Sequence, residues 1–120
     1  MSNLKYLFIE YPPCSTCKKA KKFLMDNGID FIQRNIKEEN PTKDELTEWL
    51  KKSNLPIKKF FNTSGQVYKK LNLKENLKNM TIDEQLDILS NDGMLVKRPI
   101  LVGSNLILVG FDEKKWADSV

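Results

Sequence analysis

A pair of cysteines stands between a short apolar run and an amphipathic segment, and this junction constrains the fold more than any other feature of the chain. The run LKYLFI at residues 4–9 gives way to two prolines, which predicts a buried strand that ends in a loop. The motif CSTC follows at residues 14–17, and Cys17, Ala20, Phe23 and Leu24 recur at the spacing of one helix face. Gly28 suits the left-handed conformation that commonly ends a helix. The chain is therefore predicted to begin with a strand, a cysteine-bearing loop and a helix.

The next segment repeats the strand pattern and then becomes helical. DFIQRNI at residues 30–36 alternates its side chains between two faces, which predicts a second strand. Two strands joined by one helix form a right-handed crossover unit with parallel strands. Further on, Thr42 with Glu45 and Thr81 with Glu84 match the capping box that starts a helix. The apolar residues predicted to form the inward faces of the helices in this region are Leu46, Trp49, Leu50, Val67, Leu71, Ile82, Leu86 and Leu89.

The C-terminal part predicts a hairpin and a last helix. The runs RPILV and LILVG flank the turn GSN at residues 103–105, a pattern typical of a β-hairpin. Asp112 can cap a helix that contains Trp116. When residues of about 41–92 are taken as a helical insertion, the element order is βαβ followed by ββα. That is the order of a thioredoxin-like α/β domain with a mixed four-stranded sheet, and we expect one such domain over residues 1–120.

The cysteines are expected to be reduced thiols rather than metal ligands or a permanent disulfide. No apolar run approaches the roughly 20 residues of a membrane span, and no cleavage site follows the N-terminal run, so we expect a cytoplasmic protein without membrane attachment. Cytoplasmic thiols are normally kept reduced. A structural zinc site needs about four ligands, whereas this chain has two cysteines and no histidine, so no metal is expected. A formal net charge of +4 is too small to argue for direct nucleic-acid binding.

The two cysteines differ in their expected positions on the helix. Cys14 sits just before the first turn, where free N–H groups and the helix dipole favour a thiolate and can lower a cysteine pKa from about 8.5 to about 3.5–7.5. Since the chain has no histidine, the helix, cations such as Lys18, or hydrogen bonds from Ser15 and Thr16 must stabilise the thiolate. Cys17 lies one turn further on and faces the same way, so it is the expected, more buried resolving thiol.

An inert pair remains open as an alternative, because free cysteine often serves as a small buried hydrophobe. The position of the pair between a strand and a helix favours redox chemistry. In a thioredoxin-like fold the proline before the third strand is usually cis and abuts the cysteine motif, which assigns that role to Pro99. Arg98 is then expected near Cys14, where it can stabilise a thiolate or hold an anion with two parallel hydrogen bonds. An ordinary surface arginine is the alternative for Arg98.

Five segments together resemble the arsenate reductase (ArsC)/Spx family, in the family's order and over essentially the whole chain. They are CSTCKKAKKFL, IDFIQRNIKEENPTKDEL, FNTSGQVYKKLNL, KRPILV and GFDEKKW. The resemblance implies a thioredoxin-like fold with a helical insertion. In the arsenate-reducing branch, the cysteine matching Cys14 is the nucleophile and the arginine matching Arg98 holds the oxyanion. In the Spx-type branch, regulators bind the C-terminal domain of the RNA polymerase α subunit and use CxxC as a disulfide switch.

The chain departs from the arsenate-reducing pattern. Arsenate reductases of this fold carry an arginine in the segment matching NTSGQVYKK, where this chain has Ser64 and its neighbours, and they use a single essential cysteine. We therefore expect an arsenate reductase-like thiol–disulfide oxidoreductase in which Cys14 attacks and Cys17 resolves. An Spx-type redox sensor that binds the RNA polymerase α subunit is the alternative. No glycine-rich nucleotide loop is present, so no bound cofactor is expected, and electrons would come from external glutathione, glutaredoxin or thioredoxin.

Overall fold

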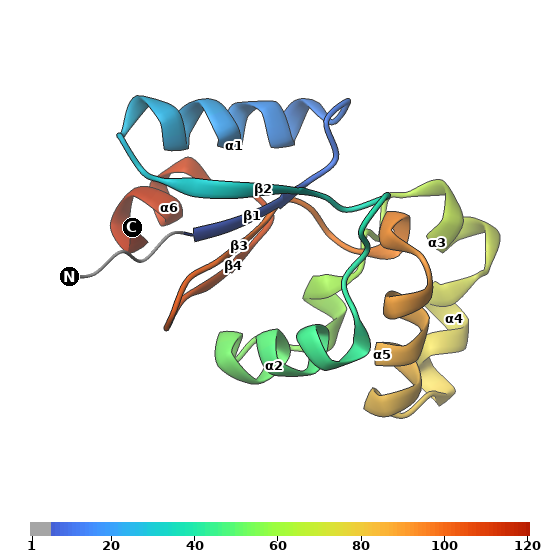
Figure 1. Ribbon diagram of the computed structural model, residues 1–120. Coiled ribbons are helices and arrows are strands. Elements are labelled where there is room, and N and C mark those ends of the chain that lie inside the picture. The colour runs from blue at the N-terminus through green and yellow to red at the C-terminus, as the bar shows by residue number, and fades with distance from the viewer. Residues whose placement is uncertain (1–5) are drawn as a thin grey trace. The chain divides into compact units, whose positions relative to one another are not determined.

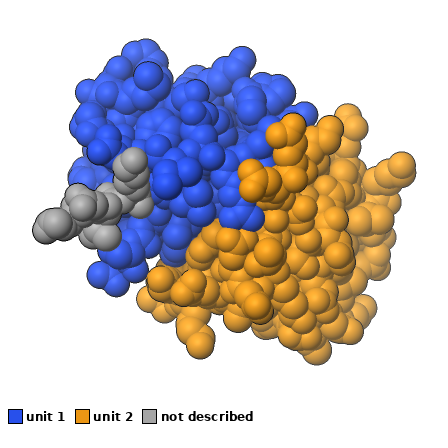
Figure 2. Space-filling model, viewed as in Figure 1, with its two compact units in different colours: residues 1–35, 98–120 blue, residues 36–97 orange. Residues whose placement is uncertain are grey.

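The computed structural model describes residues 6–120 (Figure 1), and residues 4 and 5 of the predicted first strand lie outside them. The chain forms two compact units. One holds the described residues up to Asn35 together with Arg98–Val120, and the other is Ile36–Lys97. Figure 2 colours the two units separately. No helix within residues 6–120 combines the length and the apolar character that crossing a bilayer requires.

The first unit is built on a mixed sheet of four strands in the order β2-β1-β3-β4. The strands are β1 (Tyr6–Glu10), β2 (Phe31–Asn35), β3 (Ile100–Val102) and β4 (Ile107–Val109). β1 pairs in parallel with β2 and antiparallel with β3, which in turn pairs antiparallel with β4. The predicted α/β class and the mixed thioredoxin-like sheet are thereby confirmed, and the predicted hairpin is β3–β4.

Two helices complete the first unit, α1 over Ser15–Asp26 and α6 over Glu113–Ser119. α1 ends where predicted, because Gly28 takes a φ of 66°, a conformation that residues with a Cβ seldom adopt. α6 begins at its predicted cap, where the Asp112 carboxylate accepts a hydrogen bond of 3.2 Å from the Lys115 backbone N–H. The end of α1 at Gly28 and the start of α6 at Asp112 could thus each be predicted from one residue.

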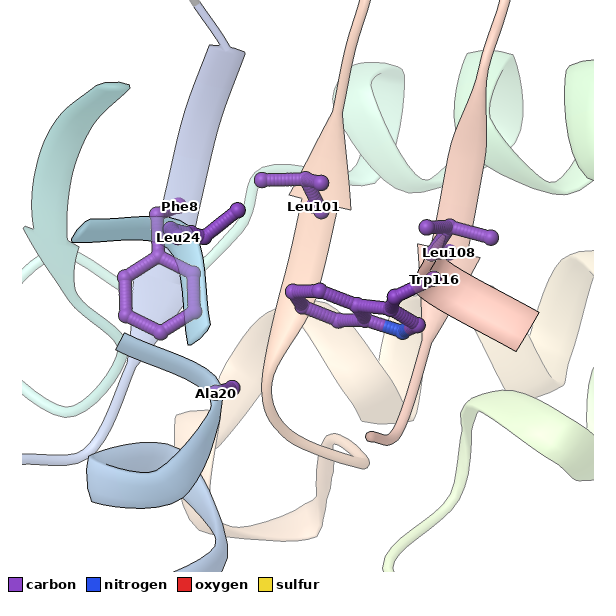
Figure 3. Packing of buried hydrophobic residues seen from close by; sticks show 6 residues of the cluster. All are labelled: Phe8, Ala20, Leu24, Leu101, Leu108 and Trp116. Atoms are coloured by element: carbon purple, nitrogen blue, oxygen red, sulfur yellow. The ribbon is translucent and has the colours of Figure 1, made fainter. Parts of the chain in front are cut away.

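The core of the first unit lies between the sheet and these two helices (Figure 3). Phe8 of β1 meets Phe31 of β2 edge to face, with ring centroids 5.4 Å apart, and meets Trp116 at 6.5 Å. The buried members of this cluster are Phe8, Ala20, Leu24, Leu101, Leu108 and Trp116. Because Ala20 and Leu24 belong to α1 and Trp116 belongs to α6, both helices pack on the same face of the sheet.

The second unit is helical in its described elements. Its helices are α2 (Lys43–Ser53), α3 (Gln66–Lys70), α4 (Leu73–Asn76) and α5 (Ile82–Asn91), with short 3₁₀-helices η1 (Ile57–Phe60), η2 (Leu77–Asn79) and η3 (Gly93–Leu95). Both predicted capping boxes are present. The Thr42 hydroxyl accepts a hydrogen bond from the Glu45 backbone N–H, and the Thr81 hydroxyl accepts one from Glu84, each at 3.1 Å. Within this unit α2 packs against α5.

Two residues predicted to face the core of this unit are instead exposed, Leu71 by 48% and Ile82 by 51%. Ile82 is the first residue of α5, and because helical side chains tilt toward the N-terminus its side chain extends past the helix end. Leu71 is the C-cap of α3, a helix of only 5 residues whose buried side chain is Tyr68. Four of the other predicted residues are buried, namely Leu46, Trp49, Leu86 and Leu89.

Candidate thiol site

Cys14 occupies the N-cap of α1, the position whose side chain covers free N–H groups of the first turn. Its Sγ accepts a hydrogen bond of 3.4 Å from the Cys17 backbone N–H. The proline-containing loop before it is closed by a backbone hydrogen bond of 2.9 Å from the Cys14 N–H to the Tyr11 carbonyl oxygen. The Cys14 side chain is half-buried, so another sulfur atom can reach it from solvent.

Cys17 lies one turn into α1 and is completely buried on the inner face of the helix. Its Sγ accepts a hydrogen bond of 3.5 Å from the Tyr11 backbone N–H at the end of β1. This hydrogen bond therefore links the end of β1 to the first turn of α1. Both cysteines are free thiols in this structure.

The two thiols differ in acidity because their surroundings differ. Partial burial raises the pKa of Cys14, but hydrogen bonds from the backbone N–H and thiol of Cys17 and from the Thr16 backbone N–H outweigh it. With the charge of Arg98, these donors hold the pKa of Cys14 below its ordinary value. Deeper burial raises the pKa of Cys17 to about 12, and the negative charge on Cys14 adds to the rise. Cys14 is therefore the stronger candidate nucleophile, and Cys17 stays protonated at neutral pH.

Arg98 brings a positive charge to both thiols from the segment before β3. The Arg98–Pro99 peptide bond is cis, as the fold led us to expect. The guanidinium lies over the Tyr11 ring, with Cζ 5.1 Å from the ring centroid. Its Nε and Nη1 atoms are buried and, among the described residues, have no hydrogen-bond partner. The charge of Arg98 contributes to the lowered pKa of Cys14 and offsets a small part of the rise in the pKa of Cys17, so these three predicted residues lie near one another.

The other residues predicted to support the site lie around this centre. Ser15, Thr16 and Lys18 are exposed on the first turns of α1, and Pro99 is buried beside Arg98. Thr16 acts on Cys14 through its backbone N–H. The supporting roles of Ser15 and Lys18 stay predictions. Among residues 6–120, no group of three or more histidine, cysteine, aspartate or glutamate side chains is arranged to hold a metal ion.

One residue of the site, and one buried acid next to it in the chain, were not predicted from the sequence. Tyr11 supplies both the N–H that contacts Cys17 and the ring beneath Arg98. Glu10 is 4% exposed, and its carboxylate accepts a hydrogen bond from the Gln33 side-chain amide. Only their position in the sequence could have indicated a place near the cysteines, since both lie between the apolar run and the two prolines that precede Cys14.

Replacing Arg98 with methionine is expected to raise the pKa of Cys14, because the substitution removes a positive charge that favours the thiolate. The rate of Cys14 alkylation by iodoacetamide at neutral pH should fall several-fold, and its midpoint should move to higher pH. Lys18→Met removes an exposed cation from the same helix and should move the midpoint less, because solvent screens that charge. Equal shifts in the two variants would contradict a specific role for Arg98.

Comparison with known proteins adds sequence and structural relatives. A sequence model of the ArsC family matches residues 9–119. YusI of Bacillus subtilis, itself uncharacterized, is 47% identical over 112 residues, which cover 93% of this chain and 95% of YusI. The global transcriptional regulator Spx 1 of Lactococcus lactis is 30% identical over 102 residues, covering 85% of this chain and 78% of that protein. The structure of a possible arsenate reductase from Streptococcus mutans matches with a TM-score of 0.88 and 42% identity, covering 97% of this chain and 99% of that one.

Proposed function

The chain belongs to the ArsC family, and from this premise we propose that it is a thiol–disulfide oxidoreductase with Cys14 as nucleophile and Cys17 as resolving thiol. The observation that carries the proposal is the contrast between the two sulfur atoms. Cys14 is accessible and has a lowered pKa, whereas Cys17 is buried one turn away and has a raised pKa. In a dithiol of this kind, the accessible sulfur forms a mixed disulfide with the substrate, and the buried sulfur then attacks that mixed disulfide and releases the substrate.

The proposed reaction has two exchange steps. The Cys14 thiolate attacks a substrate disulfide, forms a mixed disulfide with one substrate sulfur, and releases the other as a thiolate. Cys17 then attacks Cys14 Sγ, so that a Cys14–Cys17 disulfide forms and the second substrate sulfur leaves. An external thiol of the glutathione, glutaredoxin or thioredoxin type returns the pair to the dithiol. Neither step calls for a bound cofactor, because the electrons come from the two thiols.

A disulfide is a better proposed substrate than arsenate. An oxyanion needs several hydrogen-bond donors around it, and Arg98 offers the two buried donors Nε and Nη1. The only other arginine in the sequence is Arg34 in β2, and the segment 62–70, where arsenate reductases carry a further arginine, has none. A substrate disulfide needs only one cation beside the attacked sulfur, to favour the thiolates that form and leave.

Turnover of a small disulfide tests this proposal. The protein should speed the reduction of hydroxyethyl disulfide by glutathione, with glutathione reductase and NADPH recording each turnover. The rate should rise in proportion to protein concentration and disappear after alkylation of Cys14. A parallel reaction with arsenate separates the two substrates. No NADPH consumption above background with the disulfide would contradict the oxidoreductase proposal, and faster consumption with arsenate would contradict the preference for disulfides.

A redox-sensing regulator is the second candidate, and the identity to Spx 1 of Lactococcus lactis favours it. In this proposal the cysteine pair forms a disulfide under oxidising conditions, and the protein binds the C-terminal domain of the RNA polymerase α subunit. Binding of that domain is to be measured with the dithiol and with the Cys14–Cys17 disulfide. Affinity that differs between the two forms would support the regulator, and undetectable binding in both would remove it.

A further inference from the structure

The charges on α1 run against the rule that α2 and α5 follow. The helix dipole favours acids in the first turn of a helix and cations in the last. α2 has Asp44 and Glu45 in its first turn, and α5 has Asp83 and Glu84. α1 has no acid in its first turn and no basic residue in its last turn. Its cations all precede the last turn and are Lys18, Lys19, Lys21 and Lys22.

Most of these lysines are also unpaired. Lys22 forms an ion pair of 2.7 Å with Asp26, the last residue of α1. The lysine precedes the acid in this pair, which is the less favourable order on a helix. Among residues 6–120, no ion pair involves Lys18, Lys19 or Lys21. The charge layout of α1 therefore does little for the stability of the helix, and three positive charges stay uncompensated.

Two of the unpaired lysines continue the line of Cys14 along the helix. The Lys18 backbone N–H donates a hydrogen bond of 3.1 Å to the Cys14 carbonyl oxygen, so Lys18 stands one turn above the thiol. Lys21 follows three residues later, and residues spaced by four and three lie on the same side of a helix. At 1.5 Å per residue, they stand about 6 and about 10 Å from Cys14 along the axis. Both lie within the screening length of about 10 Å at 0.1 M salt.

The acids of the first unit do not offset these charges at the thiol. Glu10 is 4% exposed, and its carboxylate is engaged by a side-chain amide of β2. Asp30 precedes β2 at the end of the sheet where β1 begins, whereas Cys14 follows the end of β1. The acid-bearing segment 111–118 packs its aromatic rings on Phe23, in the second half of α1. The exposed surface of α1 next to the thiol is therefore positive.

Activation of the thiol does not account for the lysines. The cation that lowers the pKa of Cys14 is Arg98, which comes from the segment before β3. Lys18 is exposed and Lys21 half-buried. Solvent weakens the action of such charges on groups inside the protein, but they still attract charged molecules that approach the surface. The lysines are thus placed to act on whatever reaches Cys14 from outside.

We propose that Lys18 and Lys21 make the site selective for disulfides that carry carboxylates close to their sulfur atoms. The inference rests on the proposed function and names the substrate class of its first step. The two positive charges raise the concentration of an anionic disulfide at Cys14 and offset its repulsion from the thiolate. The exchange itself is unchanged. The Cys14 sulfur bonds to one substrate sulfur, the bond between the two substrate sulfurs breaks, and the other sulfur leaves as a thiolate.

Three disulfides of similar size and different charge test the inference. At neutral pH dithiodiglycolate carries two negative charges, hydroxyethyl disulfide carries none, and cystamine carries two positive charges. The loss of the free Cys14 thiol is followed by acid quenching and mass spectrometry. Each rate is divided by the rate of the same disulfide with 2-mercaptoethanol, which removes differences in intrinsic reactivity. At an ionic strength of about 0.02 M the normalised rate of the dianion should exceed that of the dication at least about tenfold, and at about 0.5 M the two should agree within about twofold.

A double variant locates the effect. Lys18→Gln combined with Lys21→Gln should lower the ratio of dianion to dication at least about threefold at low salt. A changed pKa of Cys14 would scale both rates equally and cancel in this ratio. Lys114→Gln combined with Lys115→Gln is the matched control, because it removes the same charge from exposed positions of α6 in the same unit. The control should keep the wild-type ratio.

The outcomes separate this inference from the proposed function. A wild-type ratio near one at low salt would overturn the selectivity alone, because reaction with hydroxyethyl disulfide would still support the oxidoreductase. An equal fall of the ratio in both double variants would assign the preference to net charge and overturn the role of Lys18 and Lys21, as would an unchanged ratio in their variant. A protein that reacts with none of the three disulfides would overturn the proposed function and the inference together.

Discussion

Replacing Cys14 with serine is expected to lower the rate of disulfide reduction about a thousandfold or more, because a serine hydroxyl does not ionise at neutral pH and cannot replace a thiolate nucleophile. Cys17 cannot take over the attack. It is fully buried, and burial is the largest cause of its raised pKa, about 12 in the dithiol. The glutathione-coupled reduction of hydroxyethyl disulfide measures the loss directly.

Cys17→Ser is the matched control for that experiment, since it removes the other sulfur of the same motif. This variant should still attack the substrate through Cys14 and should accumulate a mixed disulfide that mass spectrometry detects. A Cys14→Ser protein that retains more than about a tenth of the wild-type rate would contradict the assignment of Cys14 as nucleophile, because removing an attacking group costs far more than that.

Replacing Trp116 with alanine is expected to destabilise the protein by about 3–5 kcal/mol, the range typical of a large aromatic side chain removed from a core. Trp116 is 1% exposed (Figure 3) and meets Phe111, Phe23 and Phe8 edge to face, with ring centroids 5.0, 6.3 and 6.5 Å apart. Its indole N–H also donates a hydrogen bond of 3.0 Å to the Gly110 carbonyl oxygen. Urea unfolding should show a lower midpoint at an unchanged slope.

Met25→Ala provides the comparison for that variant. Met25 belongs to the neighbouring helix α1 but is 62% exposed, so its truncation should change the free energy of unfolding by less than about 0.5 kcal/mol. A loss below about 1 kcal/mol in Trp116→Ala would mean that the aromatic cluster does not hold α6 against the sheet. Since domains of this size are stable by only about 5–15 kcal/mol, the expected loss is a large share of the total.

Features that depend on a few neighbouring residues were predictable from the sequence. The capping boxes at Thr42 and Thr81, the cap at Asp112 and the glycine end of α1 each need only local hydrogen bonds or one backbone conformation. The placement of Cys14 at a helix start follows from the same local rules. Leu71 was predicted wrongly, because periodicity cannot show that α3 stops after 5 residues.

The composition of the site and of the strand end beside it was harder to predict, because it depends on contacts between distant segments. Glu10 reads in the sequence as the polar end of a strand, yet the structure buries it and joins it to Gln33, a residue 23 positions away. The Tyr11 ring contacts a cation only because the folded chain brings the segment with the cis Arg98–Pro99 bond, and with it the Arg98 guanidinium, over the ring. Burial of an acidic side chain and contact between a cation and an aromatic ring both depend on the tertiary structure, and no short sequence pattern predicts them.

The cap of α1 is a sulfur atom, and its chemical state therefore affects the backbone. In the dithiol, Cys14 Sγ accepts the Cys17 N–H and, when ionised, carries negative charge beside the positive end of the helix dipole. Such a charge stabilises a helix end by about 0.3–1 kcal/mol. Once Cys14 enters a disulfide, that charge is gone and the sulfur becomes a weaker acceptor. The proposed Cys14–Cys17 disulfide would thus exchange a charged hydrogen-bonding cap for a covalent cross-link between the N-cap and the third residue of α1.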